Sequence, residues 1–326
     1  MNPTNARSRR EFLQTTAGLV LAAGFTGACS SVPRAAPEPK HWMVACRDAH
    51  LKATGQPDCW AALKYLGITG VEVDVTPEML CPALFHPTKQ YSLATPAGIE
   101  ALAGELAARG VTITAFCMHN RFDDRLEEEI AWMRRLVPVA QALNVKVIRI
   151  DVAPHKTPED QFLPVAIKAC KAVCAVGEGR PVRYGIENHS RFTNDPAVLD
   201  QLFEAVGSPQ LGLTLDALNF YWYGWPLEEL YGMYEKFAPR VFHTHCKSIG
   251  YPPDRRNVRR PMGWEYAKYA APIYAGDIDY KRVVAILRKA NYQGDLCLEN
   301  ECLKHFPPAD QPGVLRKEIE LLKSLA

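Results

Sequence analysis

The chain has 326 residues, of which 48% are hydrophobic, and its 38 basic residues nearly balance 36 acidic ones. This length and apolar content suffice for one large core, such as that of an α/β barrel, which typically takes about 250 residues. A net charge of +2 creates no global field for nucleic acid or for an anionic membrane, which argues against both as partners.

The N-terminus is predicted to be a targeting segment. Residues 8–14 read Ser-Arg-Arg-Glu-Phe-Leu-Gln, which resembles the twin-arginine export motif, and a short apolar stretch follows to Ala28. About 14 apolar residues are too few to cross a bilayer, because a spanning helix needs about 20. Residues 1–29 are therefore predicted to be a signal peptide, with the twin-arginine machinery as a partner and the periplasm or exterior as destination.

Thr26-Gly27-Ala28-Cys29 resembles a lipobox, although Thr26 stands where Leu is usual. Two outcomes stay open, namely a lipid anchor on Cys29 or cleavage nearby that frees the protein. Residues 30–40 contain three prolines and are predicted to be a flexible linker. Residues 41–326 are predicted to form a single domain.

Ten cysteines in an exported chain would suggest disulfides, but their positions argue otherwise. Cys46, Cys117, Cys246 and Cys297 fall in predicted strands, where Cys acts as a small core residue. Cys170 and Cys174 lie four apart on a predicted helix, which is neither a zinc nor a redox spacing. We expect mostly free, buried thiols.

Apolar runs alternate with amphipathic stretches from His41 onward. The runs predict strands at Trp42–Cys46, Gly70–Val75, Val111–Cys117, Val145–Asp151, Arg183–Glu187, Leu211–Asp216, Val241–Cys246 and Asp295–Glu299. The stretches predict helices at Cys59–Leu66, Pro96–Arg109, Arg125–Leu143, Asp160–Val176, Pro196–Val206, Pro226–Phe237, Tyr280–Ala290 and Gly313–Leu325. This alternation predicts an α/β fold, a (β/α)8 TIM barrel. The alternative is an open doubly wound sheet, but no glycine-rich phosphate loop follows the first strand.

Four ionisable residues end the last four predicted strands: Glu187, Asp216, His245 and Glu299. The ends of barrel strands meet at one face, so these side chains are expected to converge there. A lone carboxylate after a strand is commonly a helix cap, and a lone strand histidine is commonly a core residue. Four together, with matching inward parity, predict a site for a hard or borderline divalent ion.

Several motifs carry a family resemblance. The sequences at Gly185–Asn188, Leu213–Asp216, His243–Ser248 and Leu296–Glu299 resemble the strand motifs of the xylose isomerase-like superfamily, and Ala62–Glu72 and Gly276–Tyr280 resemble its flanking segments. That group contains sugar isomerases and epimerases, inosose dehydratases and endonuclease IV. The similarity covers roughly His41 to Ala326.

By that resemblance, Glu187, Asp216, His245 and Glu299 bind one divalent ion, with Mn²⁺ expected first and Mg²⁺, Co²⁺ or Zn²⁺ as alternatives. Glu187 and Glu299 are also the candidate acid/base residues. Lewis acidity would stabilise an enediolate, while a neighbouring carboxylate takes the C–H proton.

Six other residues are candidate substrate contacts: Glu72, His119, Asn219, His243, Lys247 and Trp222. For Glu72 the alternative is a structural salt bridge, and His243 or Lys247 could serve as a second acid/base. Asn219 stands where many relatives carry His, which argues against a three-metal nuclease site. Trp222 lies in an aromatic segment expected to shape the pocket, unless that segment packs an oligomer. The arginines of the segment Arg255–Arg260 could bind an anion or lie in a solvated loop.

The sequence therefore predicts an exported, divalent-metal-dependent sugar isomerase or epimerase that abstracts a proton next to the carbonyl of a keto-sugar. The closest alternative is a lyase with the same chemistry, such as a dehydratase or a 3-keto-glycoside-cleaving enzyme. A non-catalytic periplasmic sugar-binding protein and a phosphodiesterase are lesser alternatives. A small carbohydrate is the expected ligand, and a homo-oligomer stays open.

Overall fold

The computed structural model describes residues 41–326, so the predicted signal peptide, the lipobox at Cys29 and the linker lie outside the described residues. Eight parallel strands form one sheet in the order β10-β1-β2-β3-β4-β5-β6-β7, and a parallel bridge between Cys246 and Leu298 joins its two edges. The strands are β1 (Met43–Arg47), β2 (Gly70–Asp74), β3 (Thr112–Cys117), β4 (Val147–Ile150), β5 (Arg183–Glu187), β6 (Leu211–Asp216), β7 (Val241–His245) and β10 (Asp295–Leu298). The predicted (β/α)8 barrel is confirmed.

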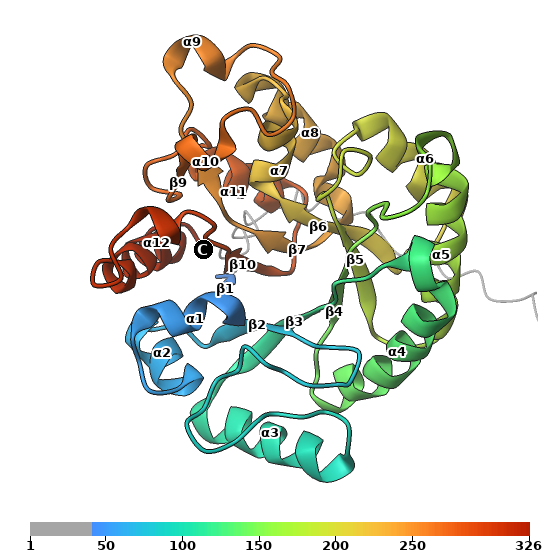
Figure 1. Cartoon of the computed structure of the whole chain (residues 1–326), viewed down its shortest axis with the longest axis vertical. Helices are drawn as coiled ribbons and strands as arrows, with labels where there is room; N and C mark the ends of the chain where they lie inside the picture. The colour runs from blue at the N-terminus through green and yellow to red at the C-terminus, as the bar shows by residue number, and fades with distance from the viewer. Residues whose placement is uncertain (1–40) are drawn as a thin grey trace, which may run out of the picture. The chain divides into compact units, whose positions relative to one another are not determined.

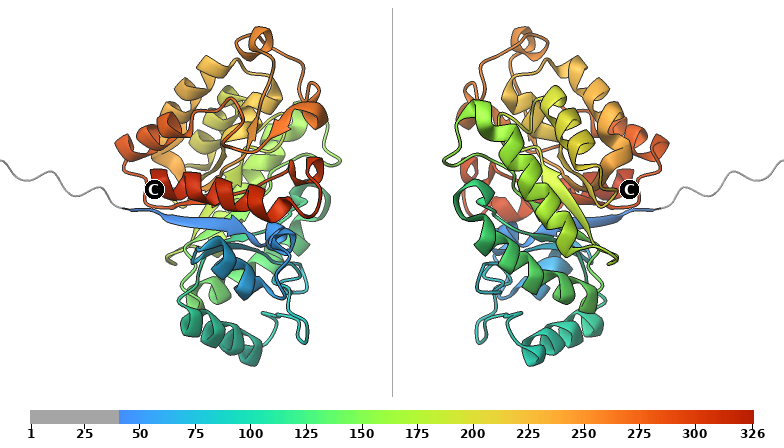
Figure 2. Two further views of the ribbon diagram at one scale, coloured as in Figure 1. Left: turned by 90° about the vertical axis from the view of Figure 1, so that its left-hand side faces the viewer. Right: turned by 90° about the vertical axis from the view of Figure 1, so that its right-hand side faces the viewer.

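Helices surround these strands (Figure 1). The longer ones are α2 (Cys59–Leu66), α3 (Pro96–Arg109), α4 (Phe122–Ala142), α5 (Phe162–Val176), α6 (Pro196–Val206), α8 (Leu227–Phe237), α11 (Tyr280–Lys289) and α12 (Gln311–Leu325). Short elements decorate the loops: α1 (Asp48–Leu51), α7 (Ala217–Tyr223), α9 (Pro253–Arg256), α10 (Tyr266–Tyr269) and an antiparallel pair, β8 (Ser248–Ile249) and β9 (Ala270–Ala271). Helix α12 packs along β1 and β10 (Figure 2). Within residues 41–326, no helix is long and apolar enough to span a bilayer.

Local sequence signals explain why several helices begin and end where predicted. The side chain of Thr95 accepts a hydrogen bond from the backbone N–H of Gly98, and Pro96 occupies the first turn of α3. Helix α3 ends at Gly110, whose φ of 63° is a left-handed conformation that glycine adopts without strain. Helix α6 repeats this pattern with an aspartate cap and a terminal glycine.

Some boundaries differ from the prediction. Strand β4 begins at Val147 rather than Val145, because the N–H of Val145 is bonded to the carbonyl of Ala140 at the end of α4. Helix α4 begins at Phe122, and a non-helical residue at Arg125 marks a kink within it. Helix α7 was not predicted, and it starts immediately after β6 because the carboxylate of Asp216 caps its first turn.

The apolar core lies between the strands and the surrounding helices, while the interior of the barrel toward its C-terminal end is polar. The leucines of β6 belong to that core, as their parity predicts. All nine described cysteines are free and buried, which confirms the prediction for every cysteine except Cys29.

Substitution of Gly185, in β5, tests how tightly the barrel interior is packed. A Cβ atom added there would collide with the hydroxyl of Thr214 on β6, whereas one added at Gly104 on α3 would meet nothing. Gly185→Ala is expected to destabilise the fold by about 1–3 kcal/mol through overpacking. Gly104→Ala, the matched control, should stabilise it by about 0.5–1 kcal/mol. Urea unfolding measures both changes, and equal effects at the two sites would contradict the packing described here.

Candidate metal centre

Four side chains meet at the C-terminal ends of β5, β6, β7 and β10. Glu187, Asp216, His245 and Glu299 each offer one ligand atom, and these atoms all lie within 4.8 Å of one another. His245 Nδ1 lies 3.0 Å from Glu299 Oε2 and 3.4 Å from Glu187 Oε1. Register explains part of this convergence, since Asp216 and His245 are direct partners in the β6–β7 ladder. All four side chains are buried.

The unsatisfied atoms of this group show what it would bind. Asp216 Oδ2, His245 Nδ1 and Glu299 Oε2 are buried and make no hydrogen bond. Two of these atoms, Asp216 Oδ2 and Glu299 Oε2, do lie 2.7 and 3.0 Å from the ammonium of Lys247. Carboxylate oxygens and an imidazole nitrogen suit Mn²⁺, Zn²⁺ and related ions. The residues therefore fit one divalent cation, which would contact all three atoms.

Asp216 has its orientation fixed by the helix that follows it. Its Oδ1 accepts hydrogen bonds from the N–H groups of Leu218 (2.8 Å) and Asn219 (3.0 Å), so its Oδ2 is directed into the centre. The side chain of Asn219 donates to Glu187 Oε1 at 3.2 Å. Asn219 therefore lies beside the ligand group and positions one of its carboxylates.

Lys247 brings a positive charge to the edge of the group. Its Nζ donates to Glu301 Oε1 at 2.8 Å. It also lies at ion-pair distance from Asp216 Oδ2 (2.7 Å) and Glu299 Oε2 (3.0 Å). The ammonium thus stands between the ligand group and Glu301, which the sequence analysis did not single out.

Two buried arginines were also missed. Arg149, in β4, contacts Glu187 Oε2 through Nε (2.6 Å) and Nη2, and Arg47, at the end of β1, donates from Nη1 to Glu299 Oε1 at 2.5 Å. Each arginine neutralises one carboxylate oxygen and leaves the other facing the centre. An arginine of inward parity within an otherwise apolar strand is the sequence signal that could have identified Arg149.

Each arginine also contacts a second carboxylate, which in turn lies beside a histidine. These second carboxylates are Asp74 for Arg47 and Asp151 for Arg149. Asp74 accepts from Arg47 Nη2 at 2.7 Å and lies 3.4 Å from Nε2 of His119, whose side chain is 57% exposed. On the other side, Asp151 lies 3.1 Å from Nδ1 of His189. The exposed imidazoles are accessible to a ligand above the centre.

The charges around the centre shift the pKa values of its carboxylates. Burial alone would raise the pKa of Glu187, but Arg149 and His245 outweigh it and hold that pKa well below its ordinary range. Glu299 is held low in the same way, against burial, by Lys247 and His245. For Asp216, burial dominates and raises the pKa to about 7. Glu187 and Glu299 are thus ionised at neutral pH, whereas Asp216 is partly protonated near neutral pH and would lose its proton when a cation binds.

Glu72 and His243 lie deeper than a substrate contact would. Both are completely buried, and Glu72 Oε2 lies 2.8 Å from His245 Nε2, below the ligand group. His243 Nδ1 lies 2.6 Å from Asp295 Oδ1. Burial opposes ionisation of His243, but Asp295 and Glu72 outweigh it and raise the pKa of His243 to about 9. Neither side chain offers a free surface to a sugar.

The aromatic and arginine-rich segments form an outer wall. Trp222, at the end of α7, packs against Gly263 rather than against the ligand group. The buried guanidinium of Arg260 stacks on Tyr221 and Tyr251, each 4.4 Å from the ring centre, and its Nη2 donates to the carbonyl of Trp225 at 2.9 Å. Arg260 therefore holds the segment together.

The fold and the centre define a (β/α)8 barrel with a carboxylate–histidine cluster at the C-terminal ends of its strands. The chain belongs to the xylose isomerase-like TIM barrel family, whose model matches residues 60–325. No curated protein sequence matches the chain significantly.

Three solved structures illustrate the range of proteins with this fold. The IOLI protein with a bound zinc atom is 14% identical (TM-score 0.61, 87% of this chain and 99% of that one). The 3-keto-D-glucoside 4-epimerase YcjR from E. coli is 13% identical (TM-score 0.61, 87% and 99%). The probable 3-DHS dehydratase AsbF from Bacillus anthracis is 15% identical (TM-score 0.56, 86% and 98%). At these identities the similarity establishes the fold.

Cation affinity at the centre should depend on pH. Asp216 must be deprotonated to act as a ligand, and its pKa of about 7 means that protons compete with the cation below neutrality. Mn²⁺ affinity is therefore expected to rise roughly tenfold between about pH 6 and about pH 8, with proton release on binding. Titration of the full chain with Mn²⁺ at several pH values measures this affinity. The Asp216→Asn variant should bind Mn²⁺ more weakly, and its affinity should change less with pH. An affinity that does not change over this range would contradict the assignment of Asp216.

Proposed function

We propose that the protein is a divalent-metal-dependent enzyme that isomerises or epimerises a keto-sugar by moving a proton next to its carbonyl group. The observation that carries the proposal is the convergence of four buried ligand atoms, from Glu187, Asp216, His245 and Glu299, within 4.8 Å of one another. Mn²⁺ is the preferred ion, with Mg²⁺, Co²⁺ or Zn²⁺ as alternatives. Membership of the family, and the epimerase and dehydratase among proteins of this fold, support an enzyme.

A divalent ion, when bound, supplies Lewis acidity that stabilises negative charge developing on a substrate oxygen. The protein supplies the proton-transfer groups, which we assign to Glu187 and Glu299. Against the effect of burial, Arg149 and His245 keep Glu187 ionised, while Lys247, His245 and Arg47 keep Glu299 ionised, so each carboxylate can accept a proton. Their low pKa values also make them weak bases. They can therefore take the C–H proton only if the negative charge that develops on the carbonyl oxygen is stabilised, which makes the C–H group more acidic. His119 and Asn219 are proposed to orient the sugar hydroxyls.

A lyase of the same fold is the second candidate, and the position of Lys247 favours it. Its ammonium hydrogen-bonds to Glu301 and borders the ligand group. There it can donate a proton to a leaving oxygen, which β-elimination requires and epimerisation does not. The products would be an unsaturated keto-sugar and a released alcohol or water.

The charges at the centre favour a neutral sugar. Arg47, Arg149 and Lys247 are paired with carboxylates of the protein, and Arg256 pairs with Asp277 at 3.0 Å. These cations are engaged, so a phosphorylated or acidic substrate would have to displace a buried ion pair.

The proposed export by the twin-arginine machinery agrees with a neutral sugar as substrate, because glycosides are available outside the cytoplasm. We propose a periplasmic or exterior location, with Cys29 as a lipid anchor if the lipobox is used, and no nucleic-acid partner.

Incubation with candidate keto-sugars in D₂O distinguishes the functions. Solvent deuterium in an otherwise intact sugar is the result expected for an isomerase or epimerase. An unsaturated keto-sugar with a released leaving group would instead identify the lyase. Tight sugar binding that is insensitive to EDTA, without any exchange, would contradict both and identify a binding protein.

Glu299→Gln tests the residue assignment in the same assay. The amide removes a charged ligand and a candidate base, so turnover should fall by about 10²–10⁴-fold while the fold is retained. Glu320→Gln, an exposed position on α12, is the matched control and should keep full activity. Turnover of Glu299→Gln at the wild-type rate would remove Glu299 from the mechanism.

A further inference from the structure

The two ring nitrogens of His245 face different surroundings. Nδ1 points to the ligand group and has no hydrogen-bond partner. Nε2 lies 2.8 Å from Glu72 Oε2. Carboxylate oxygens lie near both nitrogens, but only the contact of Nε2 with Glu72 has hydrogen-bond geometry. The proton that remains when a cation binds at Nδ1 is therefore assigned to Nε2. The interaction with Glu72 therefore selects the tautomer that can act as a ligand.

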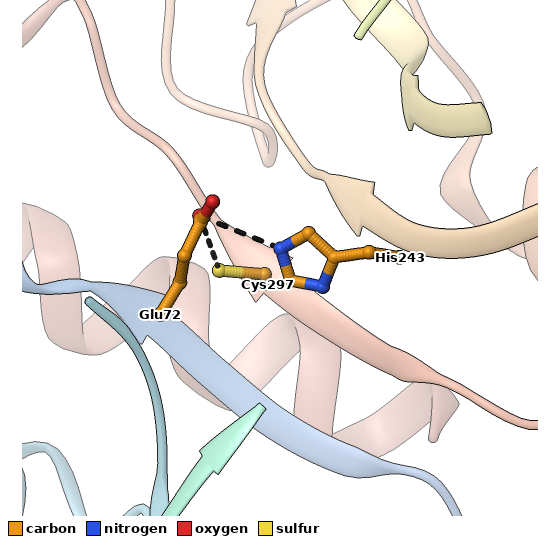
Figure 3. A group of neighbouring side chains, drawn as sticks. All are labelled: Glu72, His243 and Cys297. Carbon is orange, nitrogen blue, oxygen red and sulfur yellow. Dashed lines mark hydrogen bonds and ion pairs between the residues drawn. The ribbon is translucent and has the colours of Figure 1, made fainter. Parts of the chain in front are cut away.

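Glu72 is held in place from several directions. It lies in β2, across the barrel from His245, and has no solvent exposure. Its Oε2 accepts from Cys297 Sγ at 3.6 Å and lies 3.4 Å from His243 Nε2 and 3.5 Å from Arg47 Nε. Figure 3 shows the side chains of Cys297 and His243 directed at this oxygen. The position of the acceptor for His245 is thus fixed by contacts on three other strands.

His243 continues this chain of contacts away from the centre. It lies two residues before His245 on β7, so both imidazoles face the barrel interior. Its Nδ1 lies 2.6 Å from Asp295 Oδ1, at the start of β10. Carboxylates and imidazoles therefore alternate along the barrel interior in the order Asp295, His243, Glu72, His245. We call these four residues the buried column.

The cluster of Glu72, His243 and Cys297 has the residue types of a second metal site, but its charges argue against one. Glu72 Oε1 and His243 Nε2 are buried without a hydrogen bond, but the guanidinium of Arg47 lies 3.5 Å from Glu72 Oε2, the oxygen that faces His243 and Cys297. That oxygen is also already shared with His245. Another cation between a buried guanidinium and the first ion would be repelled by both. The cluster is better explained as support for one ion than as a site for two.

We propose that the buried column is a positioning network, in which Asp295, His243 and Glu72 fix the tautomer and ring plane of His245 and thereby set the cation affinity of the centre. This inference rests on the proposed metal-dependent function. None of the three supporting residues touches the cation or the substrate. Partners of metal-binding histidines commonly contribute about 10–100-fold to metal affinity.

The test is Mn²⁺ affinity, measured on the full chain from the paramagnetic resonance of free Mn²⁺. Glu72→Ala is expected to weaken binding by about 10–100-fold. Glu72→Gln can still accept a hydrogen bond from His245, so its affinity should lie between that of the alanine variant and wild type. Cys170→Ala is the matched control, because it removes a buried thiol on α5 that contacts no residue of the column, and its affinity should equal that of wild type.

Two further measurements separate positioning from packing. The visible spectrum of the Co²⁺-saturated protein should shift in Glu72→Gln, because the electron donation from His245 changes, whereas a variant that is only less stable keeps the wild-type spectrum. His243→Asn should weaken Mn²⁺ binding in the wild-type background but add little to Glu72→Ala, because His243 acts through Glu72.

Several results would overturn the proposal. One is wild-type affinity in both Glu72 variants, and another is a loss in Cys170→Ala as large as that in Glu72→Ala. A second equivalent of metal that disappears in Cys297→Ala would make the cluster a metal site. If the wild type does not bind Mn²⁺, the proposed function is contradicted as well. If the wild type binds Mn²⁺ and the Glu72 variants bind it with the same affinity, only the positioning role of the buried column is contradicted.

Discussion

Buried carboxylates need matching positive charge, and the arrangement at the C-terminal end of the barrel follows from that need. Removing an ion from water costs several kcal/mol even after relaxation, unless an opposite charge replaces the solvent. Arg149 and Arg47 neutralise one oxygen each of Glu187 and Glu299. Their other oxygens belong to a group in which burial raises the pKa of Asp216 to about 7, although the ammonium of Lys247 lies 2.7 Å from that carboxylate. A divalent cation would add positive charge to this group.

The barrel makes this concentration of charge tolerable because its outer core is built separately. Apolar side chains fill the space between strands and helices, so the main hydrophobic core lies outside the polar interior. The interior can then hold polar layers at successive depths. His245 and Asp216 lie side by side at the upper layer, while His243 lies two residues lower on β7. One strand thus supplies both a ligand and a residue that supports it.

The sequence predicted the fold, because strand parity, caps and glycine stops are local signals. The same parity placed Glu187, Asp216, His245 and Glu299 on one face, and the structure brings them together. Parity gives a face and not a depth, which is why Glu72 and His243 were interpreted as substrate contacts although both are completely buried. Inward parity could have placed Arg149 in the barrel interior, but its pairing with Glu187 and the burial of Arg260 depend on contacts between segments that are distant in the sequence.

Metal content of the full chain tests the central claim most directly. Elemental mass spectrometry on the wild type and on the double variant Glu187→Ala/His245→Ala, each after reconstitution with Mn²⁺, compares an intact ligand group with one that lacks two members. The account predicts about one equivalent of divalent metal in the wild type and none in a folded double variant. A wild type that retains no metal, or a double variant that retains as much as the wild type, would contradict it.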